Sequence, residues 1–193
     1  VQKLIYHNSI IFTHCHSNTL VNALIRAHKN GKKFSVINTE TRPLYRGRIT
    51  SKQLSSSGIK VIMSIDSAML GDIKKSDMVL LGADAVTKKG ILNKIGSGLI
   101  ARIALDCKKP LYIITDSWKF SLKRISIEKR PKKEVWVNPP KKVNVENDAF
   151  ELIPQKQVAL YKHEGFWYGM DTYRDYLFLN KLWEEDPKWK IWQ

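Results

Sequence analysis

The sequence predicts a doubly wound α/β fold, with a mostly parallel, Rossmann-like sheet and helices on both faces. Two observations predict it. Apolar segments of five to seven residues alternate with helical segments, as in parallel sheets whose strands are joined by helices. The helical segments carry their apolar residues on one face or end at a glycine. With 193 residues and 43% hydrophobic content, the chain can hold one such domain and a short appendage.

Local signals mark each element in the first third of the chain. An apolar run predicts a strand at residues 9–13, and Ser17 or Asn18 can cap a helix that Gly31 ends. β-Branched side chains favour a strand at residues 33–38. A short helix closed by glycine follows, and then a segment of alternating apolar residues that indicates a strand. The predicted elements are residues 9–13, 18–30, 33–38, 51–57 and 59–65.

The middle of the chain continues the alternation and then loses it. A short helix is predicted at residues 66–71, an apolar strand at 77–82, a longer helix at 93–109 and a strand at 110–115. The lysine- and proline-rich segment after residue 128 reads as an irregular loop. Within that loop, residues 134–137 are the one predicted strand.

The composition changes sharply near the end of the chain. Residues 159–193 hold ten of the nineteen aromatic side chains, including four of the six tryptophans. We therefore predict an α/β domain at residues 1–157 and an aromatic-rich, helical C-terminal tail at residues 158–193.

The charge and cysteine content restrict the class of function. A net charge of +15 favours anionic partners such as sugar phosphates, nucleotides or nucleic acid. RNA contact by the basic stretch at residues 123–142 is an alternative to a solvated surface, which we rank first. Two cysteines at unrelated positions make neither a disulfide framework nor a metal cluster. We expect no membrane span, no metal and no cofactor, and a reducing, cytoplasmic setting.

Two reactive side chains, Cys15 and Asp84, follow apolar strands at the points where those strands end. Ligands of open α/β sheets bind at the carboxyl ends of the strands. The N-terminus of the helix after Cys15 should lower the pKa of its thiol below the usual range, and a protonated His14 or His16 would lower it further. Burial predicts a raised pKa for Asp84, which could then donate a proton. The alternatives are a small buried residue at position 15 and a helix N-cap at position 84.

Further polar residues follow the other predicted strands. Arg42 could clamp a phosphate, or else form a surface salt bridge with Glu40. Lys94 precedes glycines at a predicted helix start, which is a phosphate-binding arrangement, although the spacing matches no standard nucleotide motif. Lys119 is a further candidate, whereas Asp66 reads better as a helix cap and Cys107 as a buried helical residue.

The order of these motifs resembles one protein family, over residues 5–155. It unites ribose 1,5-bisphosphate isomerase, methylthioribose 1-phosphate isomerase and the α, β and δ regulatory subunits of translation initiation factor 2B. The matching motifs are Thr13-His14-Cys15, Thr39-Glu40-Thr41-Arg42-Pro43, Asp66-Ser67-Ala68, Gly82-Ala83-Asp84-Ala85-Val86, Asn93-Lys94-Ile95-Gly96 and Lys119-Phe120.

The resemblance implies functional roles for individual residues. It makes Cys15 and Asp84 the catalytic pair of an isomerase acting on a C1-phosphorylated pentose. Asp84 would serve the ring oxygen and Cys15 would handle C2. Asn93 and Lys94 would hold the substrate, with Lys119 near a phosphate. It also implies a homodimer, with a phosphorylated sugar or nucleotide as ligand.

The chain departs from the family in ways that keep two other hypotheses open. Arg46 stands where the family usually has glutamine, and with Arg42 it is a candidate phosphate-binding residue. We also expect the family's N-terminal helical domain to be absent. The rival is therefore a non-catalytic regulatory or assembly subunit. The tail resembles the C-terminal end of glucose-1-phosphate cytidylyltransferases. The resemblance implies that Asp171 would bind a metal ion only if a nucleotidyltransferase domain supplied the other carboxylate. This suggests, as a third hypothesis, a fragment of a bifunctional sugar-nucleotide enzyme.

Overall fold

A computed structural model describes residues 1–121 and 128–154, together with residues 177, 178, 180, 181 and 184. The chain divides into two compact units, Val1–Leu160 and Tyr161–Gln193. The five described residues of the second unit are helical and exposed. The predicted boundary at residues 157 and 158, Asp171 and most of the tail lie outside the described residues.

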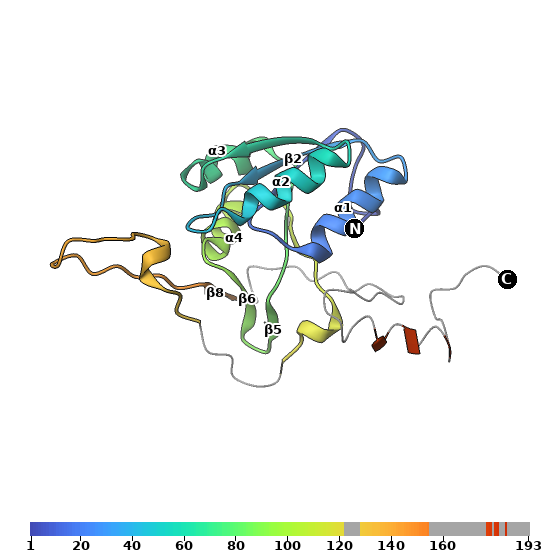
Figure 1. Cartoon of the computed structure of the whole chain (residues 1–193). Coiled ribbons are helices and arrows are strands. Elements are labelled where there is room, and N and C mark those ends of the chain that lie inside the picture. The colour runs from blue at the N-terminus through green and yellow to red at the C-terminus, as the bar shows by residue number, and fades with distance from the viewer. Residues whose placement is uncertain (122–127, 155–176, 179, 182–183, 185–193) are drawn as a thin grey trace. The chain divides into compact units, whose positions relative to one another are not determined.

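The first unit is built on a five-stranded parallel sheet in the order β3-β2-β1-β4-β7 (Figure 1). β1 lies between β2 and β4, so the chain reverses its direction of winding beside β1. This is the topological switch point, next to which open α/β sheets bind their ligands. The strands are β1 (Ser9–Thr13), β2 (Phe34–Thr39), β3 (Lys60–Ser64), β4 (Met78–Leu81) and β7 (Leu111–Ile113).

Helices cover both faces of this sheet, as the sequence predicted. Neighbouring strand residues point to opposite faces, and they enter two separate cores. Ile11 and Leu80 pack with α1 (Asn18–Lys29) and α2 (Arg46–Ser56), through Leu24 and Leu54. Phe12 and Leu81 pack in the other core with Ile73 of α3 (Met69–Lys75) and Ile100 of α4 (Ser97–Asp106).

The helix ends follow local signals in some places and tertiary contacts in others. Ser17 caps α1 by accepting a hydrogen bond from the Leu20 N–H at 3.3 Å, as predicted. α2 begins at Arg46, five residues before the predicted start at residue 51. Gly47 permits this start, because a Cβ there would lie 1.8 Å from the Thr39 carbonyl oxygen at the end of β2.

A second, antiparallel sheet corrects the predicted helix at residues 93–109. Its order is β5-β6-β8, from β5 (Ala85–Thr87), β6 (Gly90–Lys94) and β8 (Phe150–Pro154). Asn93 and Lys94 therefore belong to a strand, and α4 starts only at Ser97. The pairing of β6 with β8, such as Ile91 with Ile153, outweighs the local helical pattern because it buries both side chains.

Short 3₁₀ turns account for other differences from prediction. η1 (Asp66–Ala68) leads directly into α3, and η2 (Ser117–Lys119) follows β7. η3 (Lys132–Glu134) occupies the lysine-rich loop, where a strand at residues 134–137 was predicted. Cys107 is half-buried at the end of α4, not inside a helix. Across the described residues, no helix is both long enough and apolar enough to span a membrane.

Candidate functional site

The candidate site lies at the carboxyl ends of β1 and β4, on either side of the switch point. Cys15 follows β1 by two residues, and Asp84 follows β4 by three. The register of β1 with β4, in which Phe12 faces Val79, brings these two strand ends together. The Asp84 carboxylate is close enough to act electrostatically on the Cys15 thiol. The sheet therefore brings the two candidate catalytic residues into one site.

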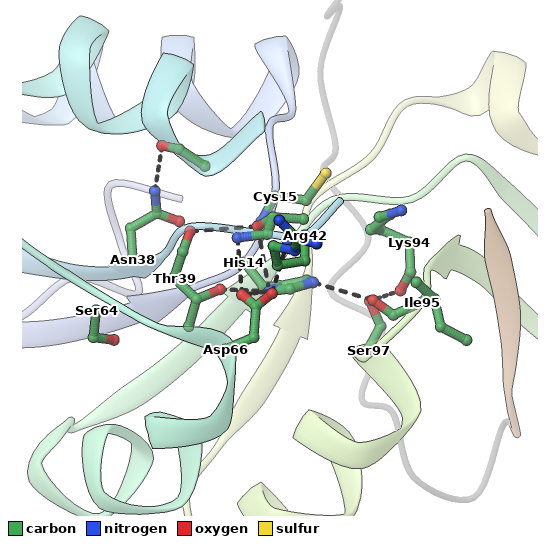
Figure 2. A network of polar contacts seen from close by, with 12 residues as sticks. His14, Cys15, Asn38, Thr39, Arg42, Ser64, Asp66, Lys94, Ile95 and Ser97 are labelled. Atoms are coloured by element: carbon green, nitrogen blue, oxygen red, sulfur yellow. Dashed lines mark hydrogen bonds and ion pairs between the residues drawn. The ribbon is translucent and has the colours of Figure 1, made fainter. Parts of the chain in front are cut away.

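The backbone of Cys15 is held by threonine side chains. Its N–H donates to Thr41 Oγ1 at 2.8 Å, and the Thr50 hydroxyl donates to its carbonyl oxygen at 2.8 Å. Cys15 has φ +67°, the left-handed region that non-glycine residues rarely adopt. Figure 2 shows the thiol directed away from the ring of His14. The thiol position thus depends on residues beyond β2, not only on β1.

Burial raises the pKa of the Cys15 thiol, which is opposite to the predicted direction. The His16 N–H, which hydrogen-bonds the thiol, and the charges of Lys94 and Arg46 act the other way, while Asp84 adds to the rise in the thiol pKa. The helix N-terminus favours a thiolate, but loss of solvent is the larger effect here. Free Cys15 is therefore a neutral thiol at neutral pH.

Asp84 is exposed and starts the turn into β5. The strand β5 follows Asp84 directly, and the Asp84 N–H donates to the Leu92 carbonyl oxygen at 2.9 Å, so the alternative of a helix N-cap is wrong. Partial loss of solvent raises the pKa of the Asp84 carboxyl, in the predicted direction, although the residue is less buried than expected. Lys119, Arg46 and Lys94 oppose this rise in the carboxyl pKa, so all three cations lie near the carboxylate.

These three cations come from separate elements. Arg46 is the first residue of α2, Lys94 is the last of β6, and Lys119 ends η2. The Ser121 N–H donates to the Val86 carbonyl oxygen at 2.8 Å, which ties the segment after η2 to β5 just beyond Asp84. The convergence of the three positive charges fits a site for a phosphorylated ligand.

Arg42 and Asn93, which were both predicted to bind the ligand, form hydrogen bonds within the protein. The Arg42 guanidinium lies 5.1 Å from the centre of the Tyr45 ring, donates to the Tyr45 hydroxyl and reaches the Val135 carbonyl oxygen at 3.5 Å. Glu40 pairs instead with Arg48, so the alternative salt bridge of Arg42 is wrong. Asn93 is buried, and its amide donates to Ser97 Oγ at 2.8 Å.

A buried polar network behind Cys15 was not predicted (Figure 2). The His14 side chain, with the residue only 5% exposed, places Nδ1 2.5 Å from Thr39 Oγ1 and Nε2 3.2 Å from the Ile95 carbonyl oxygen. A carbonyl can only accept, so Nε2 carries the proton and Nδ1 accepts in the neutral ring. Burial lowers the pKa of His14, against the attraction of Asp66 at 4.0 Å.

Asp66 belongs to this network and does not cap a helix. Its two carboxylate oxygens accept hydrogen bonds from the N–H groups of Thr41, at 2.8 Å, and Arg42, at 2.7 Å. The cluster of polar residues at positions 39–42, directly after a buried strand, was the available sequence signal. In the described part of the chain, no three His, Cys, Asp or Glu side chains group as a metal centre would require.

The fold and the site define a class: a doubly wound α/β domain with a polar, cation-rich site at its topological switch point. The chain belongs to the initiation factor 2 subunit family, whose family model matches residues 1–164. The ribose 1,5-bisphosphate isomerase of Archaeoglobus fulgidus is 36% identical over 165 residues, which cover 81% of this chain and 53% of that protein.

Another relative is named as a translation factor subunit. The initiation factor eIF2B subunit alpha of Dictyostelium discoideum is 38% identical over 62% of this chain and 37% of its own length. The crystal structure of the eIF-2B delta subunit from A. fulgidus aligns with a TM-score of 0.76 at 29% identity, over 82% of this chain and 53% of that chain. The chain thus spans about half the length of the isomerase relative and the delta-subunit structure.

Proposed function

We propose that this chain carries the isomerase site of a sugar-phosphate isomerase that converts a C1-phosphorylated pentose from aldose to ketose. The observation that carries the proposal is the Cys15 thiol and the Asp84 carboxyl at one strand-end site, ringed by Arg46, Lys94 and Lys119. The similarity to a protein named ribose 1,5-bisphosphate isomerase supports this substrate class. The phosphate on C1 prevents such a sugar from opening its ring by simple hemiacetal chemistry, so the reaction needs one group that protonates the ring oxygen and another that removes the C2 proton.

The reaction balances with one acid and one base. The acid protonates the ring oxygen as its bond to C1 breaks, while the base removes the proton from C2, and the C1–C2 double bond forms. The resulting enol then loses its hydroxyl proton as C1 gains one, which gives the C2 ketone. Asp84 acts at the ring oxygen and Cys15 at C2, and each group must change its protonation state in every turnover.

The pKa values favour one charge state of the free site. A thiol ordinarily titrates about four to five pH units above a carboxyl, and both pKa values are raised here. The neutral thiol with an ionised carboxylate is therefore the main form at neutral pH. The form with a thiolate and a protonated Asp84 holds the same number of protons and is the minor, reactive form. Bound phosphates stabilise the protonated Asp84 further.

The direct test is turnover. The folded chain is incubated with ribose 1,5-bisphosphate, and formation of ribulose 1,5-bisphosphate is followed by phosphorus NMR. Ribose 5-phosphate, which lacks the phosphate on C1, is the control and should not react. Conversion of the bisphosphate supports the proposal, whereas a well-folded sample that binds the sugar without converting it contradicts it.

The cations provide a prediction about binding. We expect Lys94→Met and Lys119→Met each to raise KM about tenfold, because a charge-assisted contact to phosphate contributes about 1.5–3 kcal/mol. Lys74→Met is the matched control, since Lys74 is exposed in the last turn of α3, which ends at the opposite edge of the sheet. Initial rates against substrate concentration measure the effect. An unchanged KM in both variants would remove these lysines from the phosphate site.

The second candidate is a non-catalytic subunit that binds a sugar phosphate or nucleotide and assembles with a like chain. The 38% identity to a protein named eIF2B subunit alpha favours it. Isothermal calorimetry with ribose 1,5-bisphosphate and with AMP, run beside the turnover assay, separates the candidates. Binding without turnover, together with dimers in sedimentation, identifies the regulatory class. The bifunctional sugar-nucleotide hypothesis stays a prediction, because it rests on residues outside those described.

A further inference from the structure

We propose that Thr41 is a positioning residue: its hydroxyl fixes the backbone of Cys15 and thereby the direction of the thiol. Asp66 in turn holds the loop that carries Thr41. The inference rests on the proposed function to the extent that Cys15 is the reactive group of the site.

The first argument is the way Cys15 is bound. Both backbone polar groups of Cys15 bond to threonine hydroxyls, the N–H to Thr41 and the carbonyl to Thr50. Thr41 Oγ1 accepts from Cys15 and lies 3.3 Å from the Thr39 carbonyl oxygen, to which it can donate its own proton. A valine at position 41 would keep the shape of the side chain and lose the acceptor.

The second argument is the backbone conformation at the two ends of this hydrogen bond. Cys15 has φ +67° and Thr41 has φ +60°. A β-branched residue is among the least suited to this region, and strained residues gather at functional sites. Glycine would relieve the backbone at position 41. Thr41 is 1% exposed, so its hydroxyl lies in the protein interior, where the Cys15 N–H at 2.8 Å is its shortest contact and His14 Nδ1 lies 3.5 Å away.

The third argument is that the Thr41 loop has its own support. The Asp66 carboxylate accepts the N–H groups of both Thr41 and Arg42, at 2.8 Å and 2.7 Å. Asp66 is the first residue of η1, two residues after the end of β3, so its hydrogen bonds connect the ends of β1, β2 and β3. A carboxylate that holds two adjacent N–H groups fixes the direction of the chain between them, and with it the Thr41 side chain.

The test measures thiol reactivity separately from turnover. In a Cys107→Ser background, Cys15 is the one remaining thiol, and its alkylation by iodoacetamide is followed as a function of pH. We expect Thr41→Ser to keep the parent profile. Thr41→Val and Thr41→Gly should shift the midpoint toward that of an ordinary thiol and raise the alkylation rate, because the released thiol gains solvent. Thr19→Val on α1 is the matched control and should change nothing.

Turnover and stability complete the test. We expect Thr41→Val and Thr41→Gly to lower kcat by about tenfold or more with KM nearly unchanged, because small misplacements of a reacting group are costly. Thr41→Gly relieves the backbone at position 41 but leaves the Cys15 N–H without its acceptor, so it should unfold at or below the temperature of the parent. If the Val and Gly variants keep the alkylation profile of Thr41→Ser, the inference is overturned. If the chain shows no isomerase turnover, the alkylation profile still decides the inference by itself.

Discussion

Replacing Cys15 by serine is expected to lower isomerase turnover by about a thousandfold or more, with the fold intact. Serine keeps the size and the hydrogen bonds of the backbone, but its hydroxyl does not ionise in the accessible pH range, so it cannot exchange a proton with C2. The chain's other cysteine, Cys107, is the C-cap of α4, at the opposite end of that helix from Gly96, which lies beside His14. Steady-state rates of purified variants, with circular dichroism as a check of folding, measure the loss.

Cys107→Ser is the matched control and should leave kcat unchanged. A Cys15→Ser variant that retains more than a tenth of the activity would exclude the thiol as an acid or base. The two results together separate a role of Cys15 in chemistry from a general effect of losing a cysteine.

The raised thiol pKa also gives Cys15 a pH-dependent effect on stability. Because burial raises the pKa in the folded protein, the folded state keeps its proton at a pH where the unfolded chain has lost it. The contribution is fully present below the pKa of the unfolded thiol and is lost as pH rises through the folded value. Above about pH 9, the free energy of unfolding of the parent should therefore fall more steeply than that of Cys15→Ser in urea titrations.

The main sheet could be predicted because each strand and helix is specified by its own residues. The apolar segments at β1, β2 and β4 are local, and so is the capping by Ser17. The second sheet could not be predicted in the same way. β6 pairs with β8, which lies more than fifty residues later in the chain, so no local pattern in residues 90–94 distinguishes it from the start of a helix.

In the site, too, the features that depend on local sequence could be predicted and those that depend on distant residues could not. Cys15 and Asp84 could be placed at strand ends, and the parallel sheet brings such ends to one edge. The direction of the thiol pKa could not be predicted, because burial depends on what packs around residue 15 and not on the helix that follows it. Likewise, nothing near Asp66 in sequence indicates that it binds the N–H groups of residues 41 and 42.

These observations give the site two layers. Cys15, Asp84 and the cations form the layer that can face a ligand. Behind it, the buried ring of His14 joins the ends of β1 and β2 to the loop before α4 through Thr39 and Ile95. A neutral, fully hydrogen-bonded His14 adds rigidity without adding charge beside the thiol, which keeps the pKa of Cys15 under the control of burial and of the outer cations.

Replacing Asp84 by asparagine is expected to lower kcat by about a hundredfold to ten-thousandfold and to remove one limb of the pH–rate profile. The proposed reaction needs one proton shared by the pair, so the rate of the parent should fall at low pH, where Asp84 is protonated beside a neutral thiol, and again at high pH, where both groups have lost their protons. Because the pKa of Asp84 is raised, the low-pH limb lies above that of an ordinary carboxyl. In Asp84→Asn the fall at high pH should disappear, because the rate then follows the Cys15 thiolate alone: it should rise through the raised pKa of Cys15 and level off. KM should stay the same or decrease, since Arg46, Lys94 and Lys119 lose a competing anion.

Asp106→Asn, at an exposed carboxylate paired with Arg102 on α4, is the control and should keep both limbs. A fall in rate at high pH that persists in Asp84→Asn would assign the acid's titration to another group and exclude Asp84 as the proton donor.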